Sequence, residues 1–111
     1  MRAEVRWIEA NDIREWPHWS PSKPAEEYQR FTVSIGIPDN LGADTFQVAV
    51  ATLAGRRERQ GKCRFVGLLV ERFDPHLVEQ AIREFVADSE ALTWEGVVQQ
   101  LQVRMRWEYG Q

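Results

Sequence analysis

The chain changes its hydrophobic period at Asp74-Pro75, and this change restricts the possible folds more than any other feature. Before that point, apolar residues recur at every second position, as in strands that bury one face. After it, they recur every three to four residues, as in amphipathic helices. Strands followed by helices predict an α+β fold, with the helices packed on one face of an antiparallel sheet.

Four segments carry the strand pattern, and they are residues 3–7, 31–35, 46–50 and 65–73. In the first, Ala3, Val5 and Trp7 alternate with charged residues, so we expect these three side chains on one face. The last segment is apolar on both faces, which indicates a central place in the sheet. We therefore expect a four-stranded, mainly antiparallel sheet.

The pattern after the period change predicts two C-terminal helices packed on one face of this sheet. The first begins after Asp74, a good N-cap, and places Pro75 where its missing N–H is not needed. The second is expected over residues 93–109, with Thr93 as N-cap and two arginines near its negative end. Each helix has one apolar face, which the sheet would cover.

The composition predicts one folded domain over residues 1–111, with 43% hydrophobic and 28% charged residues. The net charge of −3 conceals one basic segment. Five cations against one anion give residues 56–64 a net +4, so the rest of the chain carries −7. This negative charge outside residues 56–64 disfavours general nucleic-acid binding. It can attract a basic partner, or it can serve only to keep the protein soluble.

The single cysteine and the lack of long apolar segments indicate the cellular compartment of the protein. Cys63 is the single cysteine, which rules out an internal disulfide and indicates a reducing environment. Residues 1–7 lack the apolar run of a signal peptide, and no segment has the length needed to cross a bilayer. We therefore expect a cytoplasmic protein without a membrane partner.

No set of residues in the chain indicates catalysis. His18 and His76 are the only histidines, and no spacing typical of metal ligands occurs, so we expect no metal and no cofactor. Cys63 has no histidine near it in sequence. Nucleophile, phosphate-loop and dinucleotide motifs are absent from the sequence, so we predict a protein that is not an enzyme.

Seven short motifs follow one another along almost the whole chain. They are Trp16-Pro17, Phe31-x-Val33-x-Ile35-Gly36, Asp44-x-Phe46-Gln47, Val50-x-Thr52, Phe73-Asp74, Thr93-Trp94-x-x-Val97 and Trp107-Glu108-Tyr109. Together they resemble the immunity protein 8 family of bacterial polymorphic-toxin systems. The resemblance implies a small cytoplasmic protein that binds a cognate toxin domain, and we expect this protein to be a monomer or a homodimer. It would neutralise the toxin stoichiometrically, without turnover.

Two segments of opposite charge offer contacts for such a partner, since tight interfaces centre on aromatic or arginine anchors inside a polar rim. One is the irregular segment 10–29, and the other is the connection 54–64, which we expect to be a loop. The candidate partner-binding residues are Trp16, Trp19, Glu26, Glu27, Tyr28, Arg56, Arg57 and Arg59. The aromatic residues can instead cover the core, and the charges can be a solvated surface. The alternative function is a small nucleic-acid-binding or regulatory module that uses residues 56–64.

Overall fold

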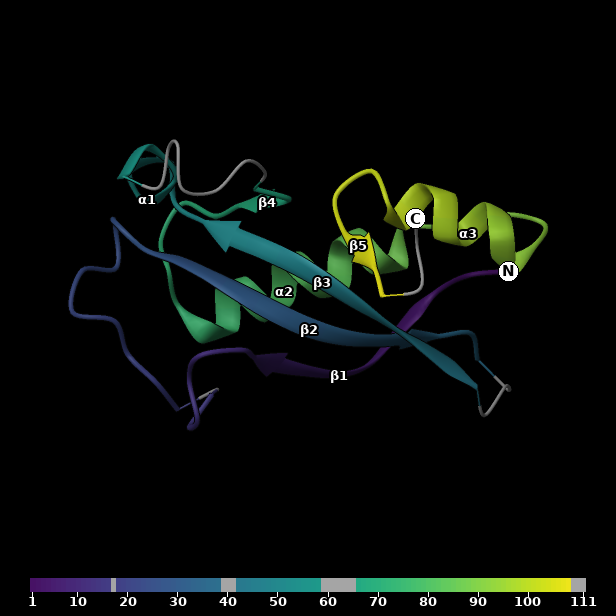
Figure 1. The fold of residues 1–111 in the computed structure, drawn as a ribbon, viewed down its shortest axis with the longest axis horizontal. Coiled ribbons are helices and arrows are strands. Elements are labelled where there is room, and N and C mark those ends of the chain that lie inside the picture. Colours follow the sequence, from purple (N-terminus) through teal and green to yellow (C-terminus); the bar gives the residue numbers. More distant parts are fainter. Residues whose placement is uncertain (17, 39–41, 59–65, 109–111) are drawn as a thin grey trace.

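A five-stranded sheet and three helices make up the part of the chain that the computed structural model describes, residues 1–16, 18–38, 42–58 and 66–108 (Figure 1). In chain order the elements are β1 (Glu4–Ala10), β2 (Tyr28–Gly36), β3 (Ala43–Ala51), α1 (Leu53–Glu58), β4 (Leu68–Leu69), α2 (Pro75–Ala87), α3 (Trp94–Leu101) and β5 (Arg106–Trp107). β1, β2 and β3 pair in antiparallel order, and β3 also pairs with β4 in parallel and with β5 in antiparallel fashion. The predicted α+β class is confirmed.

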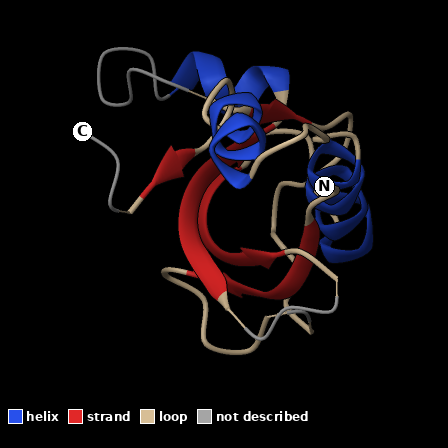
Figure 2. Cartoon of the chain, turned by 90° about the vertical axis from the view of Figure 1, so that its right-hand side faces the viewer, coloured by secondary structure: helices blue, strands red, loops and turns tan. Residues whose placement is uncertain are grey.

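The sheet is curved, and α2 and α3 lie on its concave side, which we call the inner face (Figure 2). The period-two residues of β2 and β3 point to this face, and Phe31 pairs with Val48 as Val33 pairs with Phe46. These four side chains are at most 3% exposed. The helices contribute Val78, Ile82, Val86, Val97, Val98 and Leu101 to the same core cluster. The opposite face of the sheet, which we call the outer face, is turned to the viewer in Figure 1, with α2 behind β2 and β3.

Both predicted helix starts are confirmed. The Asp74 carboxylate accepts hydrogen bonds from the backbone N–H groups of His76 at 2.9 Å and Leu77 at 3.3 Å, and Pro75 is the first residue of α2. The Thr93 hydroxyl accepts from the backbone N–H of Gly96 at 3.1 Å. Each cap satisfies N–H groups that have no partner within their helix.

The predicted extent of the second helix, residues 93–109, is wrong at its C-terminal end. α3 stops at Leu101, and turns then lead to Met105, which is buried in the core. The next residues, Arg106 and Trp107, form β5 beside β3 and do not cap a helix end. Burial of Met105 and partial burial of Trp107 against the core outweigh continued helical periodicity in this segment.

The predicted placement of Trp7 is also wrong. The register of β1 against β2 shifts between Val5 and Trp7, as it does where a β-bulge inserts one extra residue. The insertion reverses the alternation, so Ile8 and Ala10 take the inner face while Trp7 turns to the outer face. Trp7 is 46% exposed there.

Two further segments differ from their predictions. The expected central strand over 65–73 is limited to Leu68–Leu69, which lies at the margin of the sheet beside β3, and Phe65 lies outside the described residues. The expected loop over 54–64 begins as a helix, because Thr52 caps α1 through the backbone N–H of Gly55 at 3.0 Å. Neither outcome follows from local hydrophobicity, since each depends on contacts with distant segments.

Candidate partner-binding surface

Trp16 and Trp19 belong to an aromatic cluster that fastens the irregular segment 10–29 to the core. The ring centroid of Trp16 lies 4.8 Å from that of Phe31 in an edge-on arrangement, and the Trp19 ring lies 6.1 Å from Phe73. The indole N–H of Trp16 donates to the Glu79 carboxylate at 2.9 Å. Both tryptophans are half-buried, so most of their contact area serves the fold.

Tyr28 lies in a second, smaller apolar cluster. This cluster joins Tyr28 to Ala49 and Ala51 of β3, with Val66 packed against it. Because Tyr28 pairs with Ala51 and has the opposite parity to Phe31, the cluster lies on the outer face. Tyr28 is buried, so it contributes little surface to any partner.

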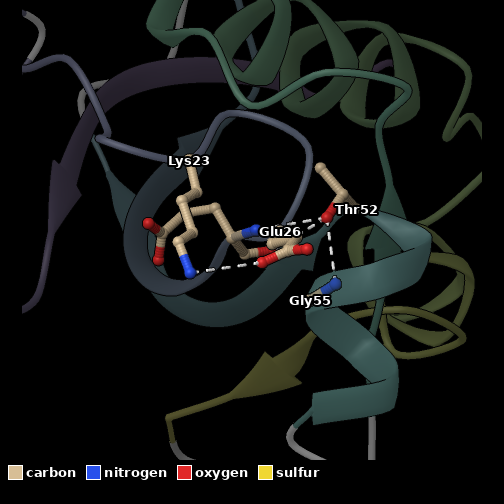
Figure 3. Close-up of polar contacts among 5 residues, drawn as sticks. Lys23, Glu26, Thr52 and Gly55 are labelled. Atoms are coloured by element: carbon tan, nitrogen blue, oxygen red, sulfur yellow. Dashed lines mark hydrogen bonds and ion pairs between the residues drawn. The ribbon is translucent and has the colours of Figure 1, made fainter.

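Glu27 joins the two candidate segments to each other, at the Thr52 and Gly55 side of the contact drawn in Figure 3. Its backbone N–H donates to the Thr52 hydroxyl at 3.2 Å, and its carbonyl accepts from the backbone N–H of Thr52 at 3.0 Å. Gly55 packs so closely against this point that an added Cβ would lie 2.0 Å from the Glu27 carbonyl oxygen. The start of α1 is therefore held against the irregular segment by three backbone groups and one buried hydroxyl.

The charged candidates at this end of the molecule remain accessible. Glu26 is exposed, and its carboxylate lies 3.8 Å from the Lys23 ammonium nitrogen. The Glu27 carboxylate accepts hydrogen bonds from the backbone N–H of Tyr28 and from the side-chain amide of Gln29. Arg56 and Arg57 are exposed on α1, and neither forms an ion pair with another described residue. Sequence reasoning treated the acidic and basic sets as alternatives, but the structure brings them to the same end. Arg59 lies outside the described residues.

The outer face holds a polar group that the sequence did not reveal. The side chains of Asn11, Thr32 and Gln47 come from three neighbouring segments and form a closed hydrogen-bonded ring. The only advance signal is the outward parity of Thr32 and Gln47 within their strands. Their meeting with Asn11 depends on the register of three strands, which periodicity does not specify.

A depression of about 450 Å³ runs along the solvent side of α2, and it is lined by His76, Glu79, Gln80, Arg83, Glu84 and Ala87. Its two carboxylates already have partners. The Glu79 carboxylate accepts a hydrogen bond from the Trp16 indole and lies 3.7 Å from the Arg83 guanidinium. The Glu84 carboxylate accepts a hydrogen bond from the side-chain amide of Gln80. Within the described residues, no three histidine, cysteine or acidic side chains come together as a metal site requires. No helix among these residues is long and apolar enough to span a bilayer.

The chain folds as a small α+β protein, and its accessible candidate residues are of the types that contact other polypeptides. The family model for immunity protein 8 matches residues 3–111, and the chain therefore belongs to this family. Its members are non-catalytic toxin inhibitors, so the protein is an immunity protein of a toxin system and not an enzyme. Membership implies toxin neutralisation and a cognate toxin as the partner. No curated protein and no solved structure matches the chain.

Proposed function

We propose that this protein neutralises its cognate toxin in the cytoplasm by forming a stoichiometric complex. The observation that carries the proposal is the family match over residues 3–111. Inhibition by occupancy needs a stable surface with a few accessible anchors, and it needs no reactive group. The expected partner is the toxin domain encoded next to this protein.

We further propose that Glu26, Glu27, Arg56 and Arg57 contact the toxin at the end of the molecule where α1 begins. We propose toxin contact for Arg59 as well, from its charge in the sequence alone. What supports the α1 contacts is the exposure of both arginines on α1 and the tight link between α1 and Glu27. Charges held on an ordered element lose less conformational freedom on binding than charges on a mobile loop. Trp16, Trp19 and Tyr28 then act mainly by holding the segment in place, and the exposed edges of the two tryptophans add contact area.

Co-expression and titration test the proposed function. The protein should restore growth of cells that express the neighbouring toxin domain, and purified toxin should lose activity with an end point at one equivalent. The end point should not move with longer incubation, because no turnover is involved. Full inhibition at far less than one equivalent of this protein per toxin would contradict the proposal. Failure of the co-expressed protein to restore growth would contradict it as well.

The α1 contacts are tested by reversing both arginines, with R83E as a control because Arg83 is also exposed but lies on the solvent side of α2. We expect the R56E/R57E variant to weaken toxin binding by about tenfold while its melting temperature stays unchanged. Equal affinity for the variant and wild type would remove α1 from the interface. Salt-sensitive binding of the wild type to duplex DNA, lost in the same variant, would instead support the nucleic-acid alternative.

A further inference from the structure

The outer face of the sheet presents one continuous row of side chains across four strands. Glu9 of β1 pairs with Thr32 of β2, which pairs with Gln47 of β3, which pairs with Arg106 of β5. Directly opposed residues of antiparallel strands project from the same face, so the row spans three strand spacings, or roughly 14 Å. It carries a carboxylate at one edge, a guanidinium at the other edge and neutral groups between them.

The centre of this row is fixed by the hydrogen-bonded ring. Asn11 donates to the Gln47 side-chain oxygen at 3.0 Å, Gln47 donates to the Thr32 hydroxyl at 2.9 Å, and Thr32 donates to the Asn11 side-chain oxygen at 2.7 Å. Each amide retains one N–H that the ring does not use. Since the ring already restricts all three side chains, a partner that binds these groups would lose little additional conformational entropy.

Trp7 and Arg106 flank the ring, and both are anchor types that dominate protein interfaces. Trp7 lies opposite Ser34, which is only 7% exposed, so the indole projects beside a small, buried residue of the sheet. Arg106 is exposed and has no ion pair or side-chain hydrogen bond with any other residue in the described ranges. The β-bulge is what brings the indole to this face, since regular alternation would have buried it.

The polar centre of the face indicates what kind of partner it fits. Permanent homodimer interfaces are strongly apolar, whereas interfaces between separately folded proteins combine a few aromatic and arginine anchors with polar groups. This face has the second composition, with one large exposed aromatic side chain beside three hydrogen-bonded polar side chains. A second copy of the chain is therefore a poorer occupant than a different folded protein.

We propose that the patch formed by Trp7, Glu9, Asn11, Thr32, Gln47 and Arg106 is the main docking surface for the cognate toxin. The toxin surface that fits it places an acidic group over Arg106, a basic group over Glu9 and a shallow apolar recess over Trp7. The identity of this partner rests on the proposed function. The α1 end of the molecule adjoins the same face through Tyr28 and Ala51, so both contact regions can serve one interface.

The experiment compares outer-face variants with matched controls elsewhere, using the toxin domain from the neighbouring gene. The variants are W7A and R106E, and their controls are L92A, at a leucine that is 95% exposed, and R83E, at an exposed arginine on the solvent side of α2. We expect each outer-face variant to raise the toxin Kd by tenfold or more, and we expect each control to stay within about twofold of wild type. Circular dichroism melting should give the same Tm for R106E and wild type, which keeps the test valid even if W7A lowers the Tm.

The outcomes separate this proposal from the proposed function. If the wild type neither binds nor neutralises the toxin, the proposed function fails. If the wild type binds and W7A and R106E bind equally well, the outer face is not the docking surface, although the proposed function stands. A wild-type dimer that W7A converts to monomers, with toxin affinity unchanged, would assign the face to self-association and overturn the proposal.

Discussion

The two faces of the sheet are built from alternating residues of the same strands, but they differ in burial and in the chemistry of their side chains. Phe31, Val33, Phe46 and Val48 point inward and are almost fully buried under α2 and α3, whereas their neighbours Thr32 and Gln47 point outward into a polar ring. Burial of large apolar groups dominates folding free energy, so the inner face is constrained by packing. The outer face contributes little to that core and is free to change for a partner. Residues that stabilise the core therefore alternate along each strand with residues that are available to a partner.

The largest test of this comparison uses adjacent residues of β2. Phe31→Ala removes a fully buried ring that contacts Trp16 and Phe73, so it should lower the free energy of unfolding by about 3–5 kcal/mol. Thr32→Ala opens the outer ring, where water can replace the lost hydrogen bonds, and should cost less than about 1 kcal/mol. Urea denaturation measures both values. Similar losses for the two variants would show that the outer ring contributes to the core fold.

A smaller effect is expected where the irregular segment meets α1. In Gly55→Ala the new methyl group would lie 2.0 Å from the Glu27 carbonyl oxygen, which is backbone, so α1 must shift. We expect a loss of about 1–3 kcal/mol in urea denaturation, together with weaker toxin binding if α1 is part of the interface. Leu53→Ala, at an exposed first position of α1, is the control and should change stability by less than about 0.5 kcal/mol. Unchanged stability in Gly55→Ala would mean that α1 is not held against Glu27.

The smallest effect comes from exchanging one tryptophan on each face for phenylalanine. Trp16→Phe removes the 2.9 Å hydrogen bond to Glu79 and part of a half-buried ring, so a loss of about 1–2 kcal/mol is expected. Trp7→Phe changes an exposed side chain and should cost less than about 0.5 kcal/mol in stability. Thermal and urea unfolding can show which of the two variants loses more stability. The reverse ranking would contradict the division of roles between the faces.

Sequence periodicity predicted the inner face well, because burial against helices imposes a regular pattern on each strand. The caps at Asp74 and Thr93 were also predictable, since capping depends on a side chain and the next two or three backbone N–H groups. The same reasoning misplaced Trp7, because one inserted residue reverses the inward and outward alternation of the β1 residues that follow it. Hydrophobic alternation does not reveal a bulge.

The remaining differences depend on contacts between distant parts of the chain. α1 is a six-residue helix, too short to form by propensity alone, and it relies on Thr52 and on packing against Glu27. β5 exists because Trp107 pairs with Phe46, although a helical pattern continues into that segment. The candidate charges at 26, 27, 56 and 57 were identified from the sequence, but their common location was not. The outer ring could not be predicted because it needs the register of three segments at once.

The outward turn of Trp7 has a practical consequence for experiments in solution. Its indole is open to water, whereas the other four tryptophans are partly buried, so acrylamide should quench the Trp7 fluorescence first. A partner that covers the outer face would shield this fluorophore and shift its emission to shorter wavelength. The molecule therefore carries its own optical reporter of docking, and Trp7→Phe supplies the blank.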